Sequence, residues 1–558
     1  MDISFDSILT QLGTGRWNIL HYIIIWFWYS LVSYHTLGGA FLAPDVRYTC
    51  RPPPHALTAS VVVYPSDVPA SEANFTYNPD DQLINQNACT YPVRNHSTGD
   101  VEEEPCTEWD FDNSTYASTV TSEFQLVCDK KYLRATYQSI YMFGILVGAG
   151  FNGFLADRFG RWTMIAISSI IYTITAVGSG WLPYLSTILV ARFLLGTMHP
   201  TSLQTGFVLV MEVTELKMRS AIGMLQFLTW SMGTMLWGGF AYFVRDWRWL
   251  QLTVSLPGLL FFPIFWLLDE SPRWLIIRGQ HERALRVLEK AAKQNKVTLP
   301  SKAELLKLME EIQHKSLSVE GTSTVGTTTS KVRYCLSQVV LLLRTPKLRI
   351  ITISMCVDYF VVAMVFFGLG LGASTLQVDP YLYMVISGLV EIPSSTVIIP
   401  FVSWFGRKRM TEYSFLVCGV ALLSQPLVPQ DYKWLSVTLV MIGKLSSTTA
   451  FSIIFLYASE LYPTEIRTRG MSAVMMSSRA GAIVSPYLMS ALSSTYPWAI
   501  TVVFGLAAML AVVATLPLSE TLNMDLPDTI TDLEDKQGVF SRKSDTKSGT
   551  SDDQTTSC

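Results

Sequence analysis

The segment GFLADRFGR, at residues 153–161, separates two long apolar runs, and a related segment, PFVSWFGRK, lies at residues 400–408. Gly160 of the first segment and Gly406 of the second are 246 positions apart. Two more pairs of segments recur at almost the same shift, residues 212–219 with 460–467 and, more weakly, 269–273 with 519–521. Since each pair follows the same apolar run of its half, the chain is built from two similar halves.

The composition is that of a membrane protein. Of 558 residues, 49% are hydrophobic and only 15% are charged, whereas a soluble protein of this size needs more charge to cover its domains. Twelve apolar runs have about the length that crosses a hydrocarbon core of roughly 30 Å. These runs lie at about 17–41, 134–156, 162–181, 185–212, 219–244, 247–268, 347–373, 380–404, 408–427, 432–457, 470–495 and 498–518.

We therefore predict an all-α membrane protein of twelve transmembrane helices in two pseudo-symmetric six-helix bundles. The first apolar run is too long for a signal peptide and is assigned as the first helix. The predicted divisions are a cytoplasmic N-terminus (1–16), an N-terminal bundle (17–268), a cytoplasmic helical linker (269–346), a C-terminal bundle (347–518) and a disordered cytoplasmic tail (519–558).

A polar loop at residues 43–133 indicates which side of the membrane is which. It carries three glycosylation acceptors, Asn74, Asn95 and Asn113, and four cysteines, Cys50, Cys89, Cys106 and Cys128. An even number of cysteines beside such acceptors is typical of an oxidising, extracellular environment. We expect two disulfides there, with three pairings open; the alternative is a cytosolic loop with reduced cysteines.

The short basic loops fall on the side opposite this loop. By the positive-inside rule, they place both termini in the cytoplasm of a multi-pass plasma-membrane protein. The same loops supply acid–base pairs that can form and break as a gate opens, or that only fix topology. The candidate gating residues are Asp157, Arg158, Arg161, Glu212, Arg219, Glu270, Arg273, Arg407, Glu460, Glu465 and Arg467.

At these segments the chain resembles the major facilitator superfamily of transporters. Residues 153–161 are similar to its loop signature after the second helix, and residues 270–275 (ESPRWL) to the one after the sixth. Residues 243–248 (FVRDWR) and 459–464 (SELYPT), with the long loop, resemble the organic cation, carnitine and organic anion transporters. Residues 441–451 and 476–486 look most like the carnitine and zwitterion branch.

The resemblance implies a secondary transporter that moves a small organic solute by alternating access, in contact with the lipid bilayer and with no nucleic acid. It implies neither cofactor nor metal; coupling to sodium or to protons, facilitated diffusion and exchange stay open, as does the oligomeric state. The C-terminal residues 556–558 are at best a weak scaffold-binding end. A sensor that keeps the fold without transporting is the alternative of a different class.

Five ionisable residues fall inside apolar runs, where each costs at least about 2.5 to 3.5 kcal/mol unless it has a partner or a wet cavity. They are Arg192, Asp358, Glu391, Lys444 and Arg479. One interpretation pairs Glu391 with Lys444 and lets Arg192 reach an interface. No nucleophile–base pair or ligand cluster accompanies them, so we expect no enzyme.

Asp358 and Arg479 are the principal candidates for substrate binding. The resemblance implies that their helices line the central cavity, and that anion and carnitine transporters carry an arginine at the position of Arg479. Together they predict a site with two opposite poles that suits a zwitterion such as a betaine or an amino acid. The alternatives are a polyspecific organic cation or anion transporter, and an Asp358–Arg479 pair.

Other residues could complete such a site. We include the aromatic residues near Asp358, the charged pair and one tryptophan as substrate-binding candidates: Tyr359, Phe366, Phe367, Glu391, Lys444 and Trp230. His21 and His35, in the first apolar run, are candidates for proton coupling or for packing.

Overall fold

The computed structural model describes residues 5–51, 89–94, 101–320 and 342–522, apart from 374, 375, 377, 397, 430, 494 and 495, together with 524, 527, 530 and 533. Within these residues, twelve helical segments coincide with the twelve predicted runs. In the N-terminal half they are α2 (Arg16–Thr36), α5 (Lys131–Phe159), α6 (Arg161–Ser179), α7 (Leu185–Val213), α8 (Leu216–Phe243), and α9 (Trp247–Ser255) continued by α10 (Pro257–Ile264) and η4 (Phe265–Leu267).

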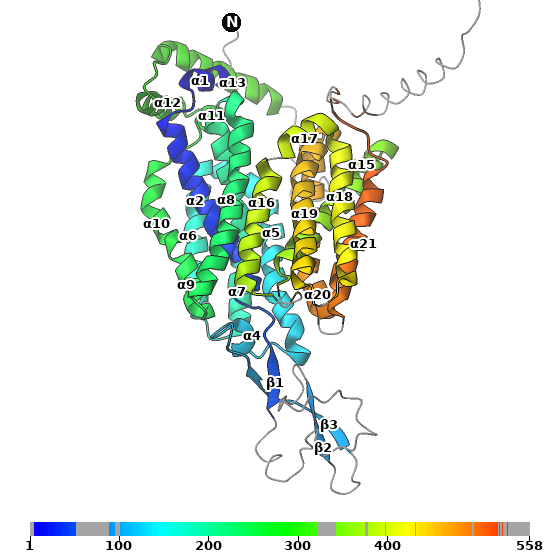
Figure 1. Ribbon diagram of the computed structural model, residues 1–558. Coiled ribbons are helices and arrows are strands. Elements are labelled where there is room, and N and C mark those ends of the chain that lie inside the picture. Colours follow the sequence, from blue (N-terminus) through cyan, green and yellow to red (C-terminus); the bar gives the residue numbers. More distant parts are fainter. Residues whose placement is uncertain are drawn as a thin grey trace, which may run out of the picture.

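The C-terminal half repeats this order of elements. Its segments are α15 (Pro346–Gly370), α16 (Pro380–Thr396) continued by α17 (Ile398–Phe405), α18 (Arg407–Ser424) with η5 (Gln425–Leu427), α19 (Lys433–Leu461), α20 (Arg467–Ser493) and α21 (Pro497–Thr515). All of them run roughly along one axis (Figure 1). Six spans of the described chain are long and apolar enough to cross a membrane by length and composition alone. The twelve helical segments, arranged in two halves of the same order, confirm the predicted fold.

One end of the bundle, here called the disulfide end, carries two small sheets that the sequence did not predict (Figure 1). Strand β1 (Tyr48–Arg51) pairs antiparallel with β4 (Glu108–Phe111), and β2 (Thr90–Arg94) with β3 (Val101–Pro105). The disulfides are Cys50–Cys106 and Cys89–Cys128, so the tertiary structure selects one of the three pairings. Short η1 (Gly38–Ala40), α4 (Val120–Glu123) and η3 (Cys128–Lys130) complete this end.

One of the three predicted glycosylation acceptors can be placed in the structure. Asn113 is exposed in a turn that follows β4. Asn74 and Asn95 lie outside the described residues, as does most of the predicted tail.

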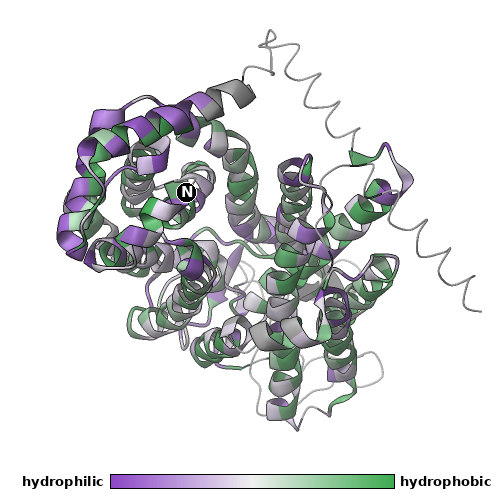
Figure 2. Ribbon diagram, turned by 90° about the horizontal axis from the view of Figure 1, so that it is seen from above, coloured by the Kyte–Doolittle hydropathy of each residue, from purple (hydrophilic) through white to green (hydrophobic). Residues whose placement is uncertain are grey.

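The opposite end, here called the basic end, is covered by a layer of short helices (Figures 1 and 2). It contains α1 (Phe5–Leu12), α11 (Pro272–Ile277), α12 (His281–Asn295) and α13 (Lys302–Glu320). These helices bury a hydrophobic core of their own, which includes Phe5, Ile8, Leu9, Leu275, Leu285, Leu288, Leu305 and Met309. Polar contacts fix this layer to the N-terminal half, among them Asp6 with Arg219 and Lys290 with Asp269, each at 2.7 Å.

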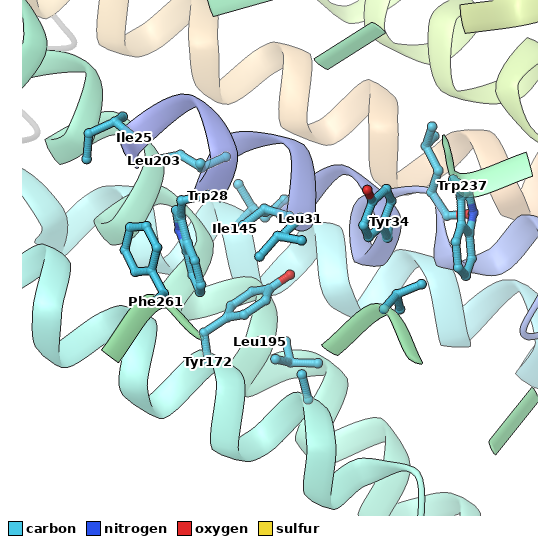
Figure 3. Packing of buried hydrophobic residues seen from close by; sticks show 14 of the residues in the cluster. Ile25, Trp28, Leu31, Tyr34, Ile145, Tyr172, Leu195, Leu203, Trp237 and Phe261 are labelled. Atoms are coloured by element: carbon cyan, nitrogen blue, oxygen red, sulfur yellow. The ribbon is translucent and has the colours of Figure 1, made fainter. Parts of the chain in front are cut away.

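The larger hydrophobic core lies mainly in the N-terminal half and extends across the contact to Phe366, Phe367 and Tyr381 of the C-terminal half. In the N-terminal half, Trp28 of α2 packs against Tyr172 of α6 and Phe261 of α10, and Figure 3 shows these rings together. The core of the C-terminal half is a separate cluster that contains Met355, Tyr359, Tyr457 and Phe504. Most of each cluster thus lies in one half, and the two halves also share apolar contacts at their boundary.

The halves meet along α5 with α20 and along α8 with α16. Four hydrogen bonds between described residues join them toward the disulfide end. They are Thr136 to Tyr487, Ser139 to the carbonyl of Ile483, Ser490 to the carbonyl of Lys131, and Tyr381 to the carbonyl of Thr115. Tyr381 also stacks on Phe41, with ring centroids 5.5 Å apart. The contact between the halves is therefore strong at this end.

The quoted segments form the same turn in both halves. Gly160 and Gly406 have φ of +99° and +92° and immediately precede α6 and α18. The carboxylate of Glu270 accepts hydrogen bonds from the backbone N–H groups of Arg161 and Trp162, at 2.9 and 3.1 Å. It thus caps the N-terminus of α6 from a distant segment, where a carboxylate is favoured by the helix dipole.

The C-terminal half reproduces this cap. The carboxylate of Glu520 accepts from the backbone N–H groups of Arg407 and Lys408, at 2.8 and 3.4 Å. A Cβ atom at Gly160 or Gly406 would collide with the capping carboxylate of its own half. Glycine is therefore required at both positions for two reasons, the backbone conformation and the space.

We predict that Gly160→Ala lowers the stability of the protein. The positive φ alone costs about 1 to 2 kcal/mol for a residue with a Cβ atom, and displacement of Glu270 adds to it. Thermal unfolding of the purified protein in detergent measures the effect. Gly153→Ala, in the same segment, is the matched control, because a Cβ there meets nothing within 4 Å. Equal melting temperatures for the two variants would contradict the capping role.

Candidate functional site

An ion pair at the basic end is repeated in the two halves. The guanidinium of Arg161 lies 3.2 Å from Glu212 and 3.1 Å from Asp157. In the C-terminal half, Nε of Arg407 lies 3.0 Å from Glu460. Position 403, which corresponds to Asp157, is a serine, so the third member is found in one half only. Both pairs join the helix that follows the glycine turn to the end of α7 or α19.

In each half, a second arginine donates a hydrogen bond to a backbone carbonyl at the C-terminal end of α7 or α19. Nε of Arg219 donates to the carbonyl of Thr214 at 3.1 Å, and Nε of Arg467 to the carbonyl of Tyr462 at 3.3 Å. These carbonyls belong to helix ends, where cationic side chains are favourable. The remaining predicted gating residues, Arg158, Arg273 and Glu465, are exposed.

These pairs connect segments within one half. Glu270 lies at the centre of the N-terminal set, and burial raises its pKa above the usual value although Arg161 and the backbone N–H groups favour the ionised form. The sets therefore hold each half together at its basic end. Their role in gating stays a prediction.

Arg192 lies inside the N-terminal bundle. Its side chain is 1% exposed, donates to the carbonyl of His35 at 3.0 Å and stacks over the rings of Tyr137 and Tyr141. The interpretation that Arg192 reaches the membrane–water interface is wrong. A carbonyl at the end of α2 and the faces of two tyrosine rings satisfy the guanidinium inside the bundle.

Lys444 and Glu391 form a buried ion pair between α19 and α16. Nζ of Lys444 lies 3.2 Å from Glu391, and both side chains are at most 2% exposed. The same Nζ donates to the carbonyl of Phe366 at 3.1 Å and lies 3.4 Å from the centroid of its ring. The two charges therefore compensate each other, as the alternative interpretation of the sequence expected.

Asp358 faces the inside of the C-terminal half. It is fully buried in α15, and its Oδ2 accepts from the hydroxyl of Thr515 of α21 at 3.1 Å. The structure does not bring Asp358 together with Arg479, either as an ion pair or as two poles of one site. The reason is rotational: the side of α15 that carries Asp358 is packed against α21.

Arg479 occupies a different environment, near the middle of α20 and facing the N-terminal half. Its charge acts on the hydroxyls of Tyr29 of α2 and Tyr141 of α5. The side chain keeps partial exposure, and no carboxylate among the described residues pairs with it. Tyr29 in turn makes an edge contact with Trp230 of α8, with centroids 6.2 Å apart.

The other aromatic candidates are packed more deeply. Tyr359 is fully buried, and Phe366 and Phe367 are 8% and 7% exposed. Phe366 contacts Phe367 edge-on at 5.2 Å and lies 6.2 Å from Phe451. Phe366 therefore lies against the Lys444–Glu391 pair, and Phe366 and Phe367 belong to the apolar core that spans the contact between the halves.

Sequence reasoning passed over one buried polar residue of the N-terminal half. His199, near the middle of α7, forms a hydrogen bond with the hydroxyl of Tyr141 through Nδ1 at 2.9 Å. Its place inside an apolar run was the signal that could have singled it out. The histidines that the sequence did single out have packing contacts: His21 with the backbone of Trp17 and Asp269, His35 with Ser255.

The fold and these charges define a class of protein. The chain has two six-helix halves with apolar helices long enough to cross a membrane, and buried charges inside the bundle. Residues 84–529 match the family model described as "Sugar (and other) transporter". The xylose transporter XylE from E. coli superposes with a TM-score of 0.61 at 16% identity, over 92% of this chain and 98% of that one.

Relatives with curated names identify the family. The chain is 30% identical to an "Organic cation transporter protein" of Drosophila melanogaster, over 95% of this chain and 94% of the relative. It is 32% identical to human "Organic anion transporter 3", over 95% and 94%. It is 31% identical to "Solute carrier family 22 member 6" of Pseudopleuronectes americanus, over 97% of both.

The chain therefore belongs to the major facilitator superfamily, within the solute carrier 22 family of organic cation and organic anion transporters. It is a secondary transporter and not an enzyme.

We predict that Lys444→Met destabilises the protein strongly, by about 3 to 5 kcal/mol, because it leaves Glu391 buried without its cation. Adding Glu391→Gln to that variant should restore most of the stability, since both charges are then removed. Thermal unfolding of the wild type, of each single variant and of the double variant measures this double-mutant cycle. Equal and additive losses would show that the two side chains act independently.

Proposed function

We propose that this protein transports organic anions across the plasma membrane by alternating access, with Arg479 as the residue that binds the anionic group. The proposal rests on one observation: the charged side chains inside the bundle differ in whether a neighbouring group compensates them. Lys444 and Glu391 neutralise each other, Asp358 is buried against α21, and Arg192 is enclosed within its own half. Arg479 is left as a partly exposed cation between the halves.

The chemistry of the surroundings fits an amphipathic anion. A guanidinium presents a planar fork that binds a carboxylate or a sulfonate through two hydrogen bonds. Tyr29 and Trp230 supply aromatic surface at the same level, and Trp230 has an indole N–H that no described group accepts. A solute with an aromatic body and one anionic group would contact all three residues.

The relatives support this choice over the zwitterion that the sequence favoured. Several of them, including the human protein, carry the name "Organic anion transporter 3". A zwitterion needs an acidic group near Arg479, and Asp358 does not supply it in this arrangement. The name of the Drosophila relative supports a cation instead. A cation would meet the positive charge of Arg479, which makes it the weaker candidate.

Alternating access is supported by the division of the bundle into two six-helix halves, which meet along α5 with α20 and along α8 with α16. In this structure the contacts of Tyr381 and of α5 with α20 hold the halves together at the disulfide end. An opening at that end would break these contacts while the capped turns keep each half intact. We place the disulfide end outside the cell and the basic end in the cytoplasm, because basic loops are retained inside.

We predict that Arg479→Gln strongly weakens the transport of aromatic carboxylates. Loss of one partner of a desolvated charge pair costs about 2 kcal/mol or more, which raises KM at least roughly 30-fold. Counterflow of a labelled aromatic carboxylate in proteoliposomes, with tetraethylammonium and carnitine in parallel, measures the selectivity.

Asp358→Asn is the matched control in these assays. Asp358 contacts Thr515 and does not belong to the proposed anion site. The KM of the Asp358→Asn variant for the carboxylate should therefore stay near that of the wild type. Carboxylate uptake that survives unchanged in Arg479→Gln would refute the assignment. Saturable binding without counterflow would identify a sensor instead of a transporter.

A further inference from the structure

We propose that the disulfide-bonded loop forms part of the gate at the disulfide end, and that Tyr381 of α16 is the residue that closes the C-terminal half onto it. The inference rests on alternating access, which is part of the proposed function, but not on the identity of the solute. It assigns a role in transport to residues 114–123, here called the loop segment, which the anion site does not use.

The loop segment is fixed to the N-terminal half. The backbone N–H of Val120 donates to the carbonyl of Leu42, just beyond α2, at 2.8 Å. The carboxylate of Glu123 accepts from the indole N–H of Trp247 at 2.8 Å and forms an ion pair with Arg248. Since Trp247 and Arg248 begin α9, the loop segment is joined to two membrane-spanning segments of the same half. It should therefore move with that half.

Tyr381 belongs to the C-terminal half, but its ring is buried in the core that lies mainly in the N-terminal half. Its hydroxyl donates to the carbonyl of Thr115, in the loop segment, at 2.7 Å. The ring stacks on Phe41, with centroids 5.5 Å apart. It also contacts the rings of Tyr116 and Tyr242, at 6.1 and 5.7 Å. One side chain of α16 is thus enclosed by aromatic rings of the opposite half and bonded to its loop.

The local sequence holds Tyr381 at the very start of its helix. Pro380 is the first residue of α16, where its fixed φ is favourable. The carboxylate of Asp379 caps this end, because it accepts from the backbone N–H groups of Tyr381 and Leu382 at 2.8 and 2.9 Å. The ring is therefore a firmly attached part of the helix end, and a tilt of the C-terminal half would withdraw it from the loop segment.

The bond to the loop differs from the other hydrogen bonds between the halves. The other three join α20, or the residues beside it on that helix, to α5. When the halves separate at this end, the Tyr381 hydroxyl and the Thr115 carbonyl can both bond to water. A hydrogen bond of this kind makes a modest net contribution, so its loss should shift the ratio of closed to open molecules by about fivefold.

The test measures how fast a thiol inside the closed contact reacts. Ser139 of α5 is 2% exposed and donates to the carbonyl of Ile483 of α20 at 2.8 Å. Every variant is made in a Ser139→Cys parent, purified without solute and treated with N-ethylmaleimide. Peptide mass spectrometry follows the label at position 139 separately from the native thiols of Cys356 and Cys418. The labelling rate follows the fraction of molecules that are open at the disulfide end.

Tyr381→Phe keeps the ring and removes only the hydroxyl, so position 139 should be labelled about fivefold faster than in the parent. Tyr383→Phe is the matched control. Tyr383 is also buried in α16, and its hydroxyl donates to the carbonyl of Leu369 within the same half. Its loss should leave the labelling rate at that of the parent. No acceleration by Tyr381→Phe, or an equal acceleration by Tyr383→Phe, would overturn the role of Tyr381.

A second substitution tests the part played by the loop. Glu123→Ala removes the contacts that hold the loop segment to α9, and should also accelerate labelling in the parent. If the loop acts through Tyr381, the acceleration should be much smaller in the Tyr381→Phe variant. Rate factors that simply multiply, or an unchanged rate in Glu123→Ala, would overturn the participation of the loop. Because no solute is present, these rates stand or fall separately from the effect of Arg479→Gln on anion transport.

Discussion

The architecture depends on a carboxylate that occupies the space a glycine leaves empty. Glu270 over Gly160 and Glu520 over Gly406 cap the helices that follow the two turns. The arginine at the start of each helix, Arg161 or Arg407, then reaches a glutamate at the end of another helix. Three distant segments of each half are joined in this way, so each half can tilt without coming apart at its basic end.

The second constraint is the free-energy cost of a charge in an apolar interior. This cost favours a compensating partner for each buried ionisable residue. Arg192 is satisfied by carbonyls and aromatic rings, Lys444 by Glu391, and Asp358 by a hydroxyl. Each of these arrangements stabilises one half or its contact with a neighbour. Arg479 is different because its surroundings belong to the opposite half, so its environment changes when the halves move. A charge in that position is suited to bind a solute that both halves must enclose.

The aromatic residues of the N-terminal half complete the surroundings of the proposed anion site. Tyr29 of α2 makes an edge contact with Trp230 of α8, so two helices of that half supply aromatic surface. The zwitterion hypothesis required Asp358 as the acidic pole of the site, but Asp358 lies against Thr515 of α21. The structure therefore leaves Arg479 as the single charged pole of the proposed site.

The sequence by itself determined the twelve helices, the two halves and the family, because apolar length and a repeat near 248 residues are properties of the chain alone. It also identified the members of both ion-pair sets, since those residues lie in the repeated segments. Only the tertiary structure decided the disulfide pairing and the sheets at the disulfide end, where short strands that are distant in the sequence pair with one another. It alone decided that Asp358 faces α21 and that the helix of Arg479 packs against α5 of the opposite half. The periodicity of a helix that is apolar on all sides does not specify its rotation; packing against its neighbours does.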